Sequence, residues 1–75
     1  MNSGIILPKL NYEKLTYDQV FCHFYGRKFT LVDLNTLEGI INHHKEINPD
    51  YSEERERLES WHSSLRKGFA MRGEL

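Results

Sequence analysis

This sequence of 75 residues contains a single cysteine and carries almost no net charge. Its single cysteine, Cys22, excludes an internal disulfide framework and is typical of a reducing compartment, so we expect a cytoplasmic protein. Ten Lys and Arg nearly cancel eleven Asp and Glu, which argues against a nucleic-acid binder that relies on bulk charge. No apolar run approaches the roughly 20 residues of a membrane span, and no basic stretch precedes an apolar signal core. We therefore expect no contact with a membrane.

Aromatic residues, in contrast, are well represented, with four Phe, four Tyr and one Trp. A disordered chain usually lacks this aromatic content and carries more net charge. The length allows one domain, residues 1–75, whose core barely offsets the entropy lost on folding. Small domains are commonly stabilised further by disulfides, a metal or another chain. Because disulfides are excluded and a metal site is poorly supported, association with another chain is the favoured solution.

The residue pattern predicts an all-α fold: a small three-helix domain with an extended N-terminal arm and a long C-terminal helix. We expect the arm at residues 1–14, helices at 17–25, 31–47 and 49–67, and a tail at 68–75. Pro8 disfavours a helix in the arm, where Ile5, Ile6 and Leu7 form an apolar run. Two interpretations of this run stay open. It folds back over the chain's own core, or it covers a partner or a second copy.

A capping box marks the start of the first predicted helix, with Thr16 as the cap and Gln19 reaching back to it. Gly26 supplies a left-handed stop. A helix this short is not stable alone in water, so its apolar face must pack on something. That face recurs at helical spacing and consists of Tyr17, Val20, Phe21, Phe24 and Tyr25.

The start of the second helix is ambiguous from sequence. Thr30 can cap a helix, or residues 28–32 can form a short strand with the helix starting at Asn35. The helix is favoured because no second strand with good alternation exists to pair with this one. Its apolar face consists of Leu34, Leu37, Ile40, Ile41, His44 and Ile47.

The third predicted helix begins with Asn48 as cap and Pro49 in the first position, and Gly68 ends it. Its glutamates, with Arg55 and Arg57 between them, are typical of a solvated face. Its apolar residues form a narrow seam that resembles a coiled-coil stripe, which predicts that a neighbouring chain completes it. Trp is enriched at interface hot spots, but a core role for Trp61 stays open as well. The seam consists of Tyr51, Leu58, Trp61 and Leu65.

Residues that could support catalysis or metal binding are present but poorly spaced. His43 and His44 are adjacent, as are Cys22 and His23, so neither pair can turn both side chains to one ion on a helix. His62 completes the set of possible zinc ligands. We expect aromatic neighbours to cover Cys22 and keep it unreactive, His44 to line the apolar face and His43 to be solvated. No glycine-rich phosphate loop is present, so we expect no enzyme, no metal and no cofactor.

A helix-turn-helix is the alternative, formed by the first helix, the link at residues 26–29 and the second helix. Its recognition helix would present Asp33, Asn35, Thr36 and Glu38, without any Arg or Lys in its first turns. Carboxylates are repelled by phosphates, which weakens this alternative. The basic residues left to contact a nucleic-acid backbone are Arg27, Lys28, Arg66, Lys67 and Arg72.

The sequence thus favours a small non-catalytic protein-interaction module. We expect a regulator or inhibitor that binds a larger protein assembly, that forms homodimers, or both. Small free-standing chains of this kind are often bacterial or phage regulators. The candidate partner-binding residues are Ile5, Ile6, Leu7, Tyr51, Leu58, Trp61 and Leu65.

Overall fold

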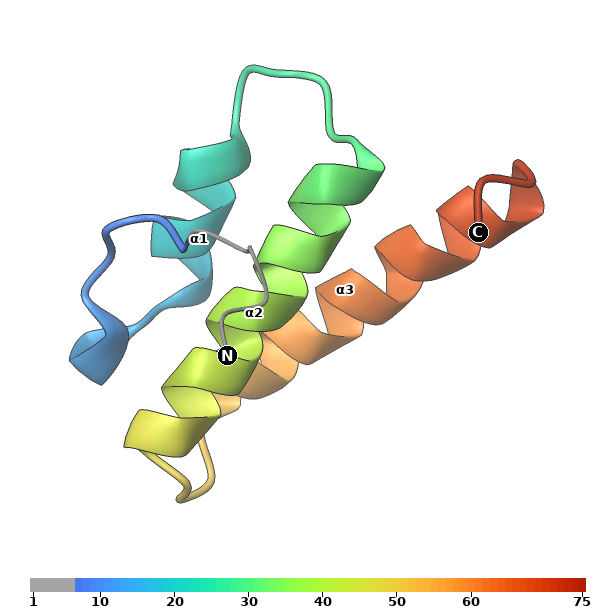
Figure 1. Ribbon diagram of the computed structural model, residues 1–75. Coiled ribbons are helices and arrows are strands. Elements are labelled where there is room, and N and C mark those ends of the chain that lie inside the picture. The colour runs from blue at the N-terminus through green and yellow to red at the C-terminus, as the bar shows by residue number, and fades with distance from the viewer. Residues whose placement is uncertain (1–6) are drawn as a thin grey trace, which may run out of the picture.

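Two long helices, α2 (Leu31–Ile47) and α3 (Glu53–Met71), cross each other and form the frame of the fold (Figure 1). The computed structural model describes residues 7–75. The short helix α1 (Tyr17–Phe24) lies beside both, and a single 3-10 turn, η1 (Tyr12–Lys14), precedes it. The predicted all-α fold with three helices and a long C-terminal helix is confirmed. The alternative strand at residues 28–32 is wrong, since α2 already starts at Leu31 and residues 7–75 contain no strand.

Helix α2 begins and ends at the predicted residues. Thr30 caps it by accepting a hydrogen bond from the Asp33 backbone N–H, while the Asp33 carboxylate accepts one from the Thr30 N–H. At the other end the Asn48 N–H donates to the His44 carbonyl oxygen over 2.8 Å. Asn48 therefore ends α2. The prediction that Asn48 caps the third helix is wrong.

Helix α3 starts later and ends later than predicted. Ser52 is its cap, accepting a hydrogen bond from the Arg55 N–H over 3.1 Å, so the helix starts at Glu53 rather than Pro49. It continues through Gly68 because Phe69, which is 3% exposed, gains burial in the next turn. Burying a phenyl ring outweighs the cost of about 1 kcal/mol for a helical glycine. Gly73, with φ of +77°, ends the helix instead.

Only half of the capping box predicted for helix α1 forms. Thr16 accepts a hydrogen bond from the Gln19 N–H over 3.1 Å. The Gln19 side chain does not reach back to Thr16, and instead accepts a hydrogen bond from the Asn11 N–H over 2.8 Å. The helix ends at Phe24, one residue early, and Gly26 has the predicted left-handed φ of +83°. Gln19 thus ties the segment before α1 to the helix.

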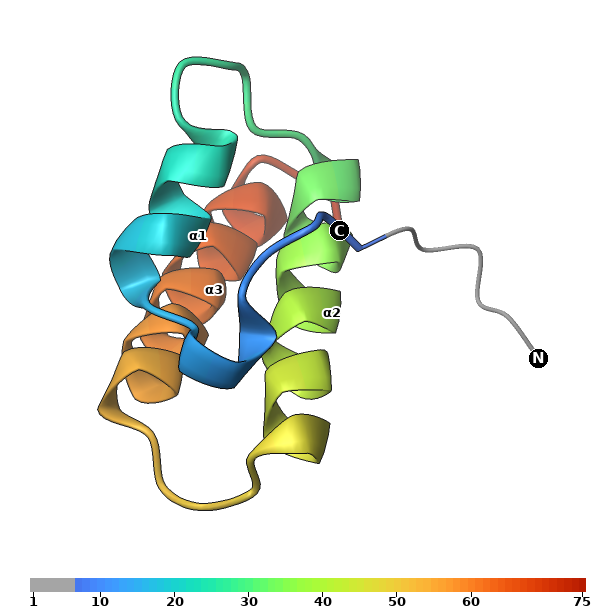
Figure 2. The ribbon, with the colours of Figure 1, turned by 90° about the vertical axis from the view of Figure 1, so that its left-hand side faces the viewer.

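The N-terminal segment lies against the chain's own core. Figure 2 shows residues 7–11 crossing the opening between α1 and α2, with α3 behind. Leu7 and Leu10 pack on the core, and the Tyr12 hydroxyl donates to the Pro8 carbonyl oxygen. The predicted arm is therefore not extended throughout, because residues 12–14 form η1. The buried core cluster consists of Leu15, Val20, Phe24, Leu37, Ile40, Ile41 and Leu58.

Candidate interaction surface

The side chains that could support chemistry are dispersed. Within residues 7–75, no three His, Cys, Asp or Glu side chains lie close enough together to hold a metal ion. Cys22 is exposed, so the expectation that aromatic rings cover it is wrong. It lies between the buried positions Val20 and Phe24 in sequence, but at 100° per residue it projects away from them. His43 is half-buried rather than solvated, with its ring edge-on to Tyr12 at 4.8 Å between centroids.

The junction between α2 and α3 holds a buried cation. Arg55 is 8% exposed, and its guanidinium donates to the carbonyl oxygens of Asn48 and Asp50 over 2.7 and 2.9 Å. Its Nη1 also lies 3.4 Å from His44 Nδ1, and His44 is 2% exposed. The assignment of Arg55 to a solvated face is therefore wrong. Three partners converge on one guanidinium and lock the connection from α2 to α3.

His44 faces the charge of Arg55 in this junction. Burial lowers the pKa of its imidazole, and the neighbouring Arg55 charge lowers that pKa further. Because arginine can only donate, Nδ1 must be the accepting nitrogen of the ring. No buried side-chain nitrogen or oxygen in residues 7–75 lacks a hydrogen-bond partner. This junction is a closed structural element with no polar group left over for a ligand.

The opposite side of α3 is open and aromatic. Along α1, the Tyr17 and Phe21 rings lie 5.9 Å apart and the Phe21 and Tyr25 rings 5.8 Å apart, between centroids. The Trp61 indole of α3 contacts this row, at 5.4 Å from Tyr17 and 5.8 Å from Phe21. Phe21 is nevertheless 40% exposed and Tyr25 75% exposed. The rings therefore form a surface as well as a packing contact.

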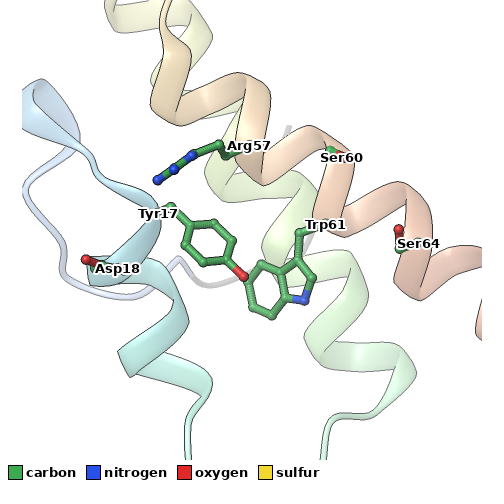
Figure 3. Close-up of a pocket in the computed structure, with 6 residues that line it drawn as sticks. All are labelled: Tyr17, Asp18, Arg57, Ser60, Trp61 and Ser64. Carbon is green, nitrogen blue, oxygen red and sulfur yellow. The ribbon is translucent and has the colours of Figure 1, made fainter.

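Two adjoining hollows meet at Trp61, and we call them together the aromatic groove. Figure 3 shows Tyr17 from α1 and Trp61 from α3 meeting between the helices, with Arg57 extending from α3 toward α1. This first hollow measures about 490 Å³ and is also lined by Asp18, Ser60 and Ser64. The second hollow, about 220 Å³, is almost entirely apolar and is lined by Phe21, Phe24, Tyr25, Gly26, Phe29, Trp61 and Leu65.

The structure brings together only part of the predicted partner-binding set. Trp61 and Leu65 lie half-buried in the aromatic groove. Leu58 has no exposed surface, because α1 and α2 enclose it, so the prediction that a neighbouring chain must cover it is wrong. Tyr51 lies apart, exposed in the loop between α2 and α3, where its hydroxyl donates to Glu56. Leu7 packs on the core, while Ile5 and Ile6 lie outside the described residues.

Sequence reasoning missed the contribution of α1 to this surface. Tyr17, Phe21 and Tyr25 follow each other at intervals of four residues, and their spacing was assigned to a buried face. The helix has only eight residues, and its buried residues are Val20 and Phe24. The spacing carried no signal of this exposure, because the same i, i+3, i+4, i+7, i+8 pattern is typical of a helix face that packs on the core.

The basic residues proposed for nucleic-acid contact lie in two segments, the link between α1 and α2 and the C-terminal part of α3 with the residue that follows it. Arg27 pairs with Asp33 over 3.3 Å, and Arg72 pairs with Glu74 over 2.8 Å. Lys28 lines a hollow with Arg72 at the start of α2. Arg66 lines a different hollow, which it shares with Glu38, and Lys67 is exposed on α3. Carboxylates therefore accompany four of the five, because Glu74 also lines the hollow of Lys28, and this lowers the positive charge available to a phosphate backbone.

No protein-family model, curated protein or solved structure matches the chain. Among the helices of residues 7–75, none combines the length and the apolar character needed to cross a bilayer.

Proposed function

We propose that this chain is a small protein-interaction module that acts by binding another protein through the aromatic groove, without catalysis. The observation that carries the proposal is the exposure of Phe21 and Tyr25 beside Trp61 in a groove between two helices. Aromatic side chains grouped around an apolar hollow are typical of interface hot spots. The partner would be a larger assembly in the cytoplasm, which the bound chain inhibits or redirects, or a second copy of the chain.

The role of Trp61 in this proposal is to form the floor of the groove. It contacts the rings of four other aromatic residues, so replacing it disturbs the fold as well as the surface. Those residues are Tyr17, Phe21, Phe24 and Phe29. A test of binding therefore needs an exposed residue at the rim of the groove. Tyr25 meets this need.

Two tyrosines form a matched pair for the test, because Tyr25 and Tyr51 are each 75% exposed and only Tyr25 lines the groove. We would compare the wild-type chain, Tyr25→Ser and Tyr51→Ser as affinity baits in lysate of the source organism, and quantify captured proteins by mass spectrometry. The expected result is a partner that the wild type and Tyr51→Ser retain equally and that Tyr25→Ser loses. A hot-spot tyrosine contributes about 2 kcal/mol or more, which corresponds to a loss of affinity of at least about thirtyfold.

The opposite pattern would contradict the groove as the binding surface. If Tyr51→Ser loses the partner and Tyr25→Ser keeps it, binding occurs at the loop between α2 and α3. If both variants capture the same proteins as the wild type, neither tyrosine contributes and the proposal fails. A captured complex that dissociates steeply with salt and contains nucleic acid would favour the helix-turn-helix alternative.

A further inference from the structure

We infer that the aromatic groove is occupied by a second copy of this chain, arranged about a two-fold axis so that α1 of each chain faces α3 of the other. The inference rests on the proposed function and names the occupant of the same surface. Two features of the groove support it: the placement of its charges, and the room on its α3 wall.

The charges of the groove are complementary to each other across its two walls. Asp18 lies on the α1 wall and Arg57 on the α3 wall of the larger hollow, and both residues are exposed. Neither takes part in a salt bridge within the part of the chain that the structure describes. In a two-fold interface, residue i of one chain meets residue j of the other, and j meets i in return. A surface with an acid on one wall and a base on the other therefore matches a copy of itself, with two Asp18–Arg57 pairs between the chains.

The α3 wall has room for the aromatic side chains of a second chain. Ser60 and Ser64 line the larger hollow beside Trp61, and their short side chains leave the indole accessible from that side. Phe21 on α1 and Tyr25 directly after it lie at the same face, where they are 40% and 75% exposed. In the paired arrangement, the rings on α1 of one chain lie over the serines on α3 of the other.

A stable pair needs to bury only a small part of the surface that this chain exposes. A standard interface buries about 800 Å² per partner, which is about one seventh of the 5508 Å² that this chain exposes. For a domain this small, whose own core is marginal, burying exposed rings in a partner adds stability that the isolated chain lacks.

The test uses charge reversal at the two walls. We would measure molar mass by size-exclusion chromatography with light scattering over a range of concentrations, for the wild type, Asp18→Arg, Arg57→Asp and an equimolar mixture of the two variants. The wild type is expected to dimerise. Each variant alone places like charges opposite each other twice, and should dimerise at least about tenfold more weakly. In the mixture both pairs are again of opposite sign, so dimers should return.

Two controls separate the pairing from effects on folding. Circular dichroism should show unchanged helix content in each variant, since both positions are exposed. Glu59→Arg reverses a charge elsewhere on the exposed surface of α3, away from the groove, and should dimerise as the wild type does.

A wild-type chain that stays monomeric over the whole concentration range overturns the inference, and so does a mixture that fails to restore dimers. In either case the proposed function is tested separately by the capture experiment. That experiment asks whether Tyr25→Ser loses a captured protein that is not a copy of this chain. If Tyr25→Ser also captures everything that the wild type captures, the groove binds neither a copy nor another protein, and both statements fail.

Discussion

The two sides of helix α3 differ in how completely they are closed. Toward α2, Arg55 is buried, and two backbone carbonyl oxygens and His44 surround its guanidinium. Toward α1, Phe21 and Tyr25 are exposed next to Trp61, although both are large apolar rings. A charge is thus buried and aromatic rings are exposed, the reverse of the usual preference. Packing and hydrogen-bond partners, rather than residue type, decide burial here.

The reason lies in the lengths of the two helices that flank α3. Helix α2 is 17 residues long and its loop into α3 places the carbonyl oxygens of Asn48 and Asp50 around the guanidinium. Helix α1 has eight residues and buries only Val20 and Phe24. The closed side holds the fold together, while the open side leaves Phe21 and Tyr25 exposed. Three predictions follow from this contrast, each aimed at one of the two sides.

Of the two sides of α3, the closed side should show the larger loss of stability when its contacts are removed. Arg55→Met keeps the aliphatic length but removes the charged donor from the carbonyl oxygens of Asn48 and Asp50. Hydrogen bonds to charged groups contribute about 1.5–3 kcal/mol each, and removing one partner leaves buried carbonyls unsatisfied, so we expect a loss of about 2–4 kcal/mol in unfolding free energy. Urea denaturation followed by circular dichroism measures it.

The matched control for this change is two residues away on the same helix. Arg57 is exposed and has no salt bridge within residues 7–75, so Arg57→Met should change the unfolding free energy by less than about 0.5 kcal/mol. Equal losses from the two substitutions would show that the buried contacts of Arg55 do not stabilise the fold.

A smaller effect is expected from titrating His44 on the same side. Burial, and then the charge of Arg55, lower the pKa of His44 in the folded chain below its usual value of about 6.5. As pH falls below about 6.5 the unfolded chain takes up a proton that the folded chain does not, so stability decreases until the folded pKa is passed. Above about pH 6.5, where His44 is neutral in the unfolded chain as well, its contribution to stability is fully present. The effect should be smaller than that of Arg55→Met, because the other two contacts of Arg55 persist.

The measurement is the unfolding free energy from pH 8 down to the onset of carboxylate titration. His44→Asn keeps an accepting atom near the guanidinium but cannot take up a proton, so its stability should depend less on pH over this range. If wild type and His44→Asn show the same pH dependence, His44 is not the group responsible, and the other histidines must be tested in turn.

Local signals in the sequence predicted the fold well, because caps and helical periodicity act over a few residues. The Thr30 cap, the Gly26 stop and both ends of α2 are where these signals place them. The predicted start of α3 was wrong because two local capping signals compete within five residues. Pro49 suits a first helical position, but Ser52 caps the helix, and the segment before it turns its carbonyl oxygens toward Arg55.

The candidate surface was only partly predictable, because it depends on which elements meet in space. Trp61 and Leu65 were identified from their spacing, but Leu58, on the same stripe, is enclosed by α1 and α2. Phe69 falls in the predicted tail at residues 68–75, although it is buried and lies within α3. Whether an apolar residue faces a neighbouring helix or solvent is decided by helix length and crossing, which a single apolar pattern does not specify. The role of this surface in binding a partner remains a prediction.

The smallest effect on stability is expected on the open side, and its small size is what makes it informative. Tyr25 is 75% exposed, so Tyr25→Ser should change the unfolding free energy by less than about 0.5 kcal/mol. The preceding residue, Phe24, is buried in the core, and Phe24→Ala should cost about 3–5 kcal/mol in the same urea titration. If Tyr25→Ser is as costly as Phe24→Ala, the ring at position 25 supports the fold and cannot be spared for a partner. A stable Tyr25→Ser chain instead allows any loss of binding to be assigned to the surface, because the two effects are then measured on the same folded protein.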